Sequence, residues 1–227
     1  MGEAVWCAMH TDRIQEVLTD ALEGRHLLTH PFYRRWEVGT LGDGELAAYA
    51  EQYRHLEYEL PVTLSAIAAE LPDGPSRQLV KANLADELGV PAPHVALFES
   101  FASAAGARSD AAPTKATEAL LASVRSAVVN DPVAALAMVA AYEVQAADIA
   151  AAKADGLRRH FGMDAAGTQF WDVHRSQEAE HARWSSEALA GLAADPAVVH
   201  AAARVAADAW WWFLDEREES APVGACC

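Results

Sequence analysis

Residues 134–147 read Ala134-Ala-Leu-Ala-Met-Val-Ala-Ala-Tyr-Glu-Val-Gln-Ala-Ala147, and this stretch decides the fold. Alanine has the highest helix propensity of all residues, and its abundance favours closely packed helices over sheets. We therefore expect an all-α protein. Glu143 is the only charged residue of the stretch. A carboxylate buried among such apolar side chains needs a cation or hydrogen-bond donors. Glu143 is therefore a candidate metal ligand, and the alternative is that it faces solvent.

Helix signals continue on both sides of this stretch, and no series of strands competes with them. Asp131 is the expected N-cap of the central helix, and Pro132 lies in its first turn. Pro61 is expected to kink another long helix because its ring removes a backbone donor. The predicted helices span about residues 11–24, 31–39, 44–70, 76–88, 95–105, 132–160 and 167–189, and two more begin at Pro113 and Pro196.

The succession of helices predicts one domain. We expect a single helical domain over residues 1–227, with its core over about residues 11–216 and a flexible tail over about 218–227. The expected architecture is a bundle of about seven or eight helices. Residues 210–212 are three consecutive tryptophans, which cannot all face one side of a helix. At least one of them is therefore expected at the surface or at a subunit contact.

The chain is strongly acidic. It has 17 Lys and Arg against 33 Asp and Glu, which gives a formal net charge of −16. Binding to nucleic acid or to an anionic membrane depends on clustered basic residues, so neither partner is expected. The sequence has no evident signal peptide, membrane span or lipidation motif, and its three cysteines lack metal-site spacing. These features predict a cytoplasmic protein.

One predicted helix carries His174, Glu178 and His181 on a single face. At about 100° per residue, offsets of four and seven residues place the three side chains within about 60° of arc. Carboxylates combined with neutral imidazoles suit iron or manganese. Chance is the alternative, because the acidic chain contains nine histidines.

Further candidate ligands flank a predicted helix break at Gly89, Pro91 and Pro93. The break lets the chain turn, so that side chains on either side of it can point into one cavity. Helical bundles that hold two metal ions combine carboxylates and histidines from several helices. Six ligands are enough for two ions and leave positions for dioxygen or substrate. The candidate set is Glu87, His94, Glu143, His174, Glu178 and His181.

Other segments of the chain resemble proteins with the haem-oxygenase-like fold. They include Leu27–Trp36, Leu46–Tyr53, Asn83–Glu87, Ala141–Glu143, Lys153–Leu157 and Trp211–Leu214. Within that group the chain is most similar to the family of the chlamydial protein associating with death domains, over about residues 25–216. More distantly, it resembles the TenA-like and PqqC-like proteins.

The resemblance implies a seven-helix bundle that activates dioxygen with two metal ions and without haem. It implies iron at both positions, or iron with manganese, and an external reductant. In the better-studied relatives, p-aminobenzoate is formed from a tyrosine of the protein itself, and a lysine is considered the source of the amino group. By position, Tyr33 matches that tyrosine and Lys153 that lysine, while Tyr49 and Tyr142 match further tyrosines near the site.

Three features depart from the family pattern. Glu178 stands where the family usually has Asp, which keeps the charge and adds a methylene group. Phe170 stands where the p-aminobenzoate-forming relatives have a tyrosine. Glu57 and Glu59 stand where those relatives have apolar residues.

Glu57 is the most informative departure. Tyr49, Tyr53 and Glu57 are spaced by four residues and share a helix face, whereas Glu59 is rotated by about 200° from Glu57. In this fold, an extra glutamate on this helix is associated with enzymes that oxidise external amines or amino acids. Glu57 is therefore expected to be either a seventh metal ligand or a surface residue paired with Arg54 or a lysine.

The main functional hypothesis is a di-iron oxidase that uses dioxygen to oxidise a small amine- or amino-acid-derived substrate. Tyr33, Tyr49, Tyr53 and Lys153 are candidates for substrate contact or radical transfer. The first alternative is self-sacrificing p-aminobenzoate synthesis that consumes Tyr33 and uses Lys153. The second alternative is a metal-free helical binding or partner protein. A homodimer is compatible with the fold.

Overall fold

The computed structural model describes residues 3–89 and 92–220, and in these ranges its regular elements are all helices. The α-helices are α1 (Glu3–Ala21), α2 (Pro31–Glu37), α3 (Glu45–Glu70), α4 (Pro75–Glu87), α5 (His94–Ala104), α6 (Lys115–Asn130), α7 (Pro132–His160), α8 (Ala165–Gly191) and α9 (Pro196–Glu219), with a 3₁₀ turn, η1 (Leu27–Thr29), before α2. The expected all-α bundle is confirmed. In the described residues seven helices have 13 or more residues, and α2 and α5 are shorter.

Three predicted boundaries are wrong. The first helix begins at Glu3 and not near Thr11. Pro113 is not in the first turn of α6, because Thr114 is the N-cap residue of that helix, and its N–H donates to Gln52 Oε1 at 2.8 Å. Helix α9 continues to Glu219, so it includes the start of the predicted tail. The rest of that tail, residues 221–227, lies outside the described residues.

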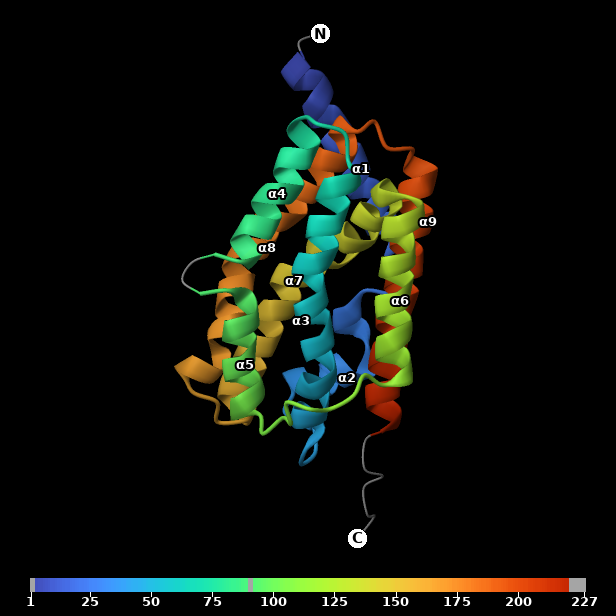
Figure 1. Cartoon of the computed structure of the whole chain (residues 1–227). Coiled ribbons are helices and arrows are strands. Elements are labelled where there is room, and N and C mark those ends of the chain that lie inside the picture. The colour runs from blue at the N-terminus through green and yellow to red at the C-terminus, as the bar shows by residue number, and fades with distance from the viewer. Residues whose placement is uncertain (1–2, 90–91, 221–227) are drawn as a thin grey trace.

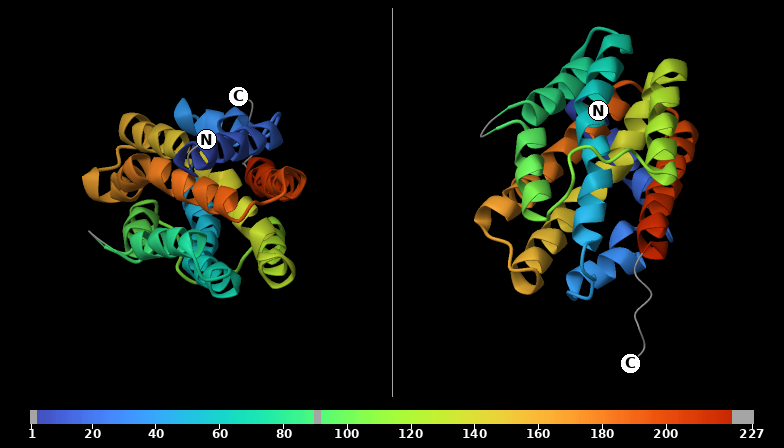
Figure 2. Two further views of the ribbon diagram at one scale, coloured as in Figure 1. Left: turned by 90° about the horizontal axis from the view of Figure 1, so that it is seen from above. Right: turned by 60° about the horizontal axis from the view of Figure 1, so that its bottom comes forward.

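The long helices run along the length of the bundle. In Figure 1, α3 crosses in front of α7, with α4 and α5 on one side and α6 and α9 on the other. The tilted view in Figure 2 keeps this order, so α3 separates the two pairs. Helix α7 packs most extensively against α8 and α9. This central position agrees with its alanine content, which allows its neighbours to approach closely.

Helix α7 begins and ends as its sequence predicts. Asp131 caps the helix by accepting hydrogen bonds from the N–H groups of Val133 and Ala134, and Pro132 occupies the first turn. In the described part of the chain, α7 is the one helix that is long and apolar enough to cross a membrane. Its most apolar window is 67% buried within the bundle, which is typical of a core helix.

Two hydrophobic clusters fill the interior. The first, which we call the aliphatic cluster, contains no aromatic ring and includes Leu64, Leu136 and Leu189. The second, the aromatic cluster, gathers Phe, Tyr and Trp side chains that include Tyr53 and Trp171. Each of α3, α7 and α8 passes from one cluster into the other. Polar residues placed midway along these three helices therefore meet between the clusters.

Candidate metal centre

The six predicted ligands meet at this midpoint of the bundle. Helix α4 supplies its last residue, α5 its first, α7 one carboxylate and α8 three side chains. Each of the six is at most 5% exposed, so the group is shielded from water. The residues are Glu87, His94, Glu143, His174, Glu178 and His181.

The break between α4 and α5 brings the first pair together. Because α4 ends at Glu87 and α5 begins at His94, both side chains turn inward, and Nδ1 of His94 lies 2.8 Å from Oε2 of Glu87. Pro93 is the N-cap residue of α5, whereas the predicted contribution of Pro91 lies outside the described residues. One ligand atom each from Glu87, His94 and His174 lie within 4.8 Å of one another.

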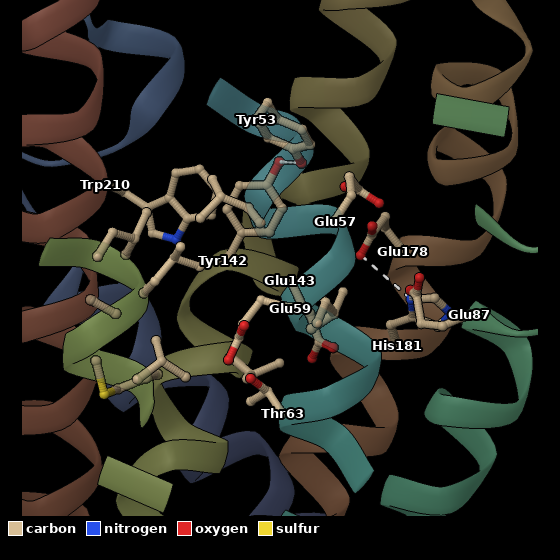
Figure 3. A pocket seen from close by; sticks show the side chains of 18 of the residues that line it. Tyr53, Glu57, Glu59, Thr63, Glu87, Tyr142, Glu143, Glu178, His181 and Trp210 are labelled. Atoms are coloured by element: carbon tan, nitrogen blue, oxygen red, sulfur yellow. Dashed lines mark hydrogen bonds and ion pairs between the residues drawn. The ribbon is translucent and has the colours of Figure 1, made fainter. Parts of the chain in front are cut away.

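The three residues of α8 lie along one inner face of the helix. Nε2 of His174 is 3.6 Å from Oε1 of Glu178, and Nδ1 of His181 is 3.7 Å from Oε2 of Glu178. Nδ1 of His181 is also 3.6 Å from Oε1 of Glu87. The side chains of Glu87, Glu178 and His181 converge on one another in Figure 3. The Glu178 carboxylate therefore lies between the two histidines of its own helix.

Each histidine is oriented by a hydrogen bond on its outer ring nitrogen. The pairs are His174 Nδ1 with the Phe170 carbonyl at 2.9 Å, His181 Nε2 with Asp86 Oδ2 at 2.7 Å, and His94 Nε2 with Gln177 Oε1 at 3.1 Å. These acceptors fix the N–H on the outer nitrogen and leave the inner nitrogen free to bind a metal ion. Gln177 also donates to Asp86 Oδ1 at 3.3 Å. This bond links the hydrogen-bond partner of His94 to that of His181.

The carboxylates fit a cation site. Among the described residues, one oxygen of each of four buried glutamates has no hydrogen-bond partner, and these are Glu57, Glu87, Glu143 and Glu178. The other oxygen of Glu143 accepts from Asn83 Nδ2 at 2.6 Å. Buried carboxylates without partners are costly unless a cation balances them. Four carboxylates carry the charge that two divalent cations would balance.

The crowding of negative charge shifts the pKa of several groups. Burial and the charge of Glu178 raise the pKa of Glu143 to about 7. Burial opposes protonation of His181, but hydrogen bonding to Glu178 and the charges of Glu178, Glu143 and Glu87 raise its pKa to about 10. Without metal, protons therefore accumulate in this group to offset its charge.

Glu57 belongs to the same group. It is 4% exposed on α3, and its burial and the charges of Glu87 and Glu178 raise its pKa well above the usual value. The alternative of a surface residue paired with Arg54 is wrong, because Arg54 pairs with Glu99 at 2.6 Å. Glu59, rotated away on the same helix, pairs with Arg125 at 2.7 Å. Glu57 is therefore buried, and it lines the same cavity as Glu143 and Glu178.

The second predicted group, around Lys153, lies in the aromatic cluster. Lys153 is 2% exposed, and its Nζ donates to Tyr49 OH at 2.6 Å. Tyr49 OH in turn lies 2.8 Å from Tyr33 OH. Nζ also lies 4.0 Å from the ring centre of Trp171 and 4.8 Å from that of Tyr53. Burial lowers the pKa of Lys153 well below its usual value, which favours the uncharged amine.

Helix α2 carries Tyr33 into this cluster through close packing on α7. At Gly156 an added Cβ would lie 3.0 Å from the Trp36 carbonyl oxygen, so the absence of a side chain lets Trp36 approach. Trp36 Nε1 donates to the Lys153 carbonyl at 3.2 Å. At the start of α2, His30 accepts from the Phe32 N–H at 3.1 Å. His30 therefore caps the N-terminus of α2.

Two further tyrosines connect this cluster with the carboxylates. Tyr53 OH lies 2.7 Å from Tyr142 OH. Tyr53 stands one turn before Glu57 on α3, and Tyr142 directly precedes Glu143 on α7. Tyr53 also stacks on Tyr49 with 5.4 Å between ring centres. Figure 3 shows the Tyr53 and Tyr142 hydroxyls meeting beside the carboxylates, so this pair lies between the two predicted groups.

The residues that support the histidines are not evident from the sequence. Asp86 and Gln177 both lie next to candidate ligands in the sequence, but neither has a spacing that reveals its contact. Asn83 lies one turn before Glu87 on α4, and that helix periodicity is a signal that could have identified it. Of residues 210–212, Trp212 is 42% exposed, which agrees with the expected surface position.

A family model described as iron-containing redox enzyme matches residues 47–213 of the chain. A 4-aminobenzoate synthase of Nitrosomonas europaea is 38% identical, and the alignment covers 96% of each chain. A 4-aminobenzoate synthase of Chlamydia trachomatis is 30% identical over 91% of each chain. These similarities extend over nearly the whole chain, and the range matched by the family model spans the positions of all six candidate ligands.

Solved structures show the same fold at low sequence identity. A TenA homologue from Pseudomonas syringae superposes with a TM-score of 0.78 at 13% identity, covering 96% of this chain and 98% of its own. A CADD-like protein from Nostoc punctiforme gives 0.76 at 17% identity, with 94% and 100% covered. A Shewanella denitrificans domain with a haem-oxygenase-like fold gives 0.72 at 17% identity, with 92% and 90% covered.

Proposed function

The chain belongs to the family of iron-containing redox enzymes with a haem-oxygenase-like fold, and from this we propose that it forms 4-aminobenzoate from its own side chains. In this proposal Tyr33 supplies the aromatic ring and Lys153 the amino nitrogen. The names of the similar proteins from Nitrosomonas and Chlamydia support the product. The resemblance noted for Tyr33 and Lys153 supports the source of its atoms.

The observation that carries the proposal is the buried chain of contacts from Lys153 through Tyr49 to Tyr33. Lys153 Nζ is 2.6 Å from Tyr49 OH, which is 2.8 Å from Tyr33 OH. In this chain of contacts, the Tyr49 hydroxyl alone stands between the Lys153 amine and the Tyr33 phenol. Among the described residues Lys153 forms no ion pair, and burial lowers its pKa, which favours the form with a lone pair on nitrogen. An uncharged amine is the form that can bond to an oxidised ring.

The carbon skeleton fits this assignment. The ring and Cβ of Tyr33 contain the seven carbons of 4-aminobenzoate in the required para arrangement. The reaction must break the Cα–Cβ bond, oxidise Cβ to a carboxylate and replace the phenolic oxygen by the nitrogen of Lys153. It must also break the Nζ–Cε bond of Lys153. Dioxygen is the oxidant in this proposal, with an external reductant.

The metal ligands proposed for this chemistry are the six buried side chains described above, with Glu57 as a seventh. Glu87, His94 and His174 would hold one ion, and Glu143, Glu178 and His181 would complete the site for a second. Iron at these positions supplies the activation of dioxygen. The charge balance of four carboxylates against two divalent cations supports a pair of ions, either two irons or iron with manganese.

The Tyr53–Tyr142 pair can transfer protons and oxidising equivalents in the same reaction. Its two hydroxyls, 2.7 Å apart, can pass a proton between the carboxylate side and the Tyr49 side of the site. Tyr53 stacks on Tyr49, so an oxidising equivalent has a short path between adjacent rings toward Tyr33. Burial raises the pKa of both Tyr53 and Tyr142, which keeps these hydroxyls protonated until they are oxidised.

Labelled protein tests this function. The chain is produced with tyrosine carrying ¹³C in the ring and lysine carrying ¹⁵N in the side chain, loaded anaerobically with iron(II), and exposed to air with a reductant. The expected result is 4-aminobenzoate that carries both labels, together with a mass loss confined to Tyr33 and Lys153. Unlabelled 4-aminobenzoate, or an intact chain after dioxygen consumption, contradicts the proposal.

A second candidate function is the oxidation of an external amine or amino acid, and one observation favours it. Glu57 is buried beside the ligand set, at a position where an added glutamate is associated with such enzymes. For this function the chain stays intact, and one compound among a set of amines and amino acids accelerates dioxygen consumption. A metal-free partner protein is disfavoured, because it would retain four buried carboxylates with unpartnered oxygens.

A further inference from the structure

An apolar cavity that Tyr33 does not line leads to the candidate metal centre. It has a volume of about 90 Å³ and is bounded by α3, α6, α7 and α9. Its inner end is formed by the carboxylates and histidines, as Figure 3 shows for Glu57, Glu143 and Glu178. The remaining wall is formed by side chains that include Leu60, Leu121, Val124, Met138, Val139 and Trp210.

The cavity reaches the metal ligands without reaching the residues proposed to react. Tyr53 and Tyr142 line it, whereas Tyr33 and Lys153 do not. The Tyr53–Tyr142 pair therefore forms a wall between the cavity and the aromatic cluster. A molecule that enters the cavity meets the metal site but stays separated from Tyr33.

Two residues of the cavity wall also line a groove on the surface. Glu59 and Leu121 belong to both the cavity and the groove. Arg125, in the groove, donates from Nε and Nη2 to the two oxygens of Glu59 at 2.8 and 2.7 Å. Arg125 is 49% exposed and Glu59 18%, so this pair lies at the boundary with solvent. The Leu121 side chain and this ion pair therefore lie where the cavity adjoins the groove.

We propose that this cavity is the binding site and entry route for dioxygen, from the groove between α3 and α6 past Leu121. The inference rests on the oxygen dependence of the proposed function. A small uncharged molecule gives up no strong hydration when it enters an apolar space, and empty apolar cavities in proteins bind xenon. An anionic substrate would find no lysine or arginine among the described residues that line the cavity.

Xenon is the probe for the site itself. Crystals of the iron-loaded protein pressurised with xenon are expected to hold a xenon atom between Leu121 and Val139. Xenon bound only elsewhere, or none at all, overturns the proposal. This measurement is independent of 4-aminobenzoate formation, so its failure and the failure of the proposed function are distinguishable.

Variants test the route. Leu121→Trp fills the mouth, and Ala206→Leu narrows the wall formed by α9, where Ala206 is 1% exposed. Val129→Trp is the matched control, because Val129 is on the same helix as Leu121 but is 83% exposed. Iron content and thermal unfolding are measured first for each variant.

The dioxygen concentration that gives half the maximal oxidation rate of the iron(II) protein is then compared. It is expected to rise several-fold in either cavity variant and to be unchanged in Val129→Trp. Two variants from different helices protect the test against a folding defect in one. If a folded, iron-loaded cavity variant keeps the dioxygen dependence of the natural chain, the route is wrong.

Discussion

Nε2 of His181 and Oδ2 of Asp86 are joined by a 2.7 Å hydrogen bond, which directs the other ring nitrogen of His181 toward Glu87 and Glu178. Asp86 is itself held by Gln177. Such outer contacts fix the orientation of a histidine ligand and increase its basicity.

Removing this support is expected to weaken metal binding. Asp86→Ala should lower the iron affinity by about 10–100-fold, the usual cost of losing an outer hydrogen bond to a ligand. Asp86→Asn keeps an acceptor and should lose less. Glu180→Gln, at an exposed site on α8, is the control. Anaerobic iron titration measures the effect, and equal affinities in all three variants would show that Asp86 does not support the site.

His174 provides a direct test of the metal site. His174→Ala removes a buried imidazole whose Nε2 faces Glu178, and the variant is expected to lose iron and dioxygen consumption together. His200→Ala changes a partly exposed histidine and should retain both. Iron content by elemental analysis and an oxygen electrode are sufficient. Unchanged activity in the His174 variant would remove the metal proposal.

Tyr33 and Lys153 are expected to be needed for product but not for iron. Tyr33→Phe and Lys153→Met keep the buried volume, so iron uptake should stay close to that of the natural chain while 4-aminobenzoate formation is lost. Tyr58→Phe alters a tyrosine that is 53% exposed and should have no effect. The product is measured by mass spectrometry after one aerobic incubation. Product from either core variant at the natural yield contradicts the assigned roles.

Glu57 and Glu59 make a matched pair of variants. Glu57→Gln removes one of the four buried charges and is expected to reduce the affinity for the second metal ion. Glu59→Gln breaks the surface pair with Arg125 and should leave metal binding intact. Titration with iron(II), followed by counting of the bound ions, distinguishes the two. Full occupancy of both positions at natural affinity in Glu57→Gln would exclude it as a ligand.

The metal-free protein is expected to lose stability as the pH rises. The folded-state pKa of Glu143 is about 7, above the value of about 4.5 for an unperturbed glutamate. The folded state therefore binds the proton more tightly, and this contribution is fully present below about pH 4.5 and is lost as the pH rises through about 7. Thermal unfolding in the presence of a chelator, measured over this pH range, gives the change in stability with pH for the natural chain and for Glu143→Gln. An identical pH dependence in the two proteins would contradict the raised pKa of Glu143.

The fold could be predicted from sequence because its signals are local. Alanine-rich stretches, Asp131 before Pro132 and the break between Glu87 and His94 each act within a few residues. The first boundary of α6 was wrong because the decisive contact of Thr114 is with Gln52, which lies on another helix.

The candidate site was likewise predictable only where its signal lies within one helix. The spacing of His174, Glu178 and His181 is a property of one helix and is visible in the sequence. The sequence alone does not determine whether Glu57 is buried, because its burial depends on how α3 is rotated about its axis relative to α4 and α8. The hydrogen bonds of Asp86 depend on the distance between α4 and α8. Contacts of this kind follow from packing and have no periodic signal.

The burial of Tyr33 has a consequence for the lifetime of the protein. Tyr33 is 3% exposed and packs against Phe32, Trp36 and Tyr49. Loss of its ring would leave a hole in the aromatic cluster, and deletion of a large buried ring typically costs about 3–5 kcal/mol. That is a large fraction of the stability of an ordinary domain. A chain that has given up its tyrosine would therefore unfold more readily than a fresh one, so that cellular proteases could remove used copies selectively.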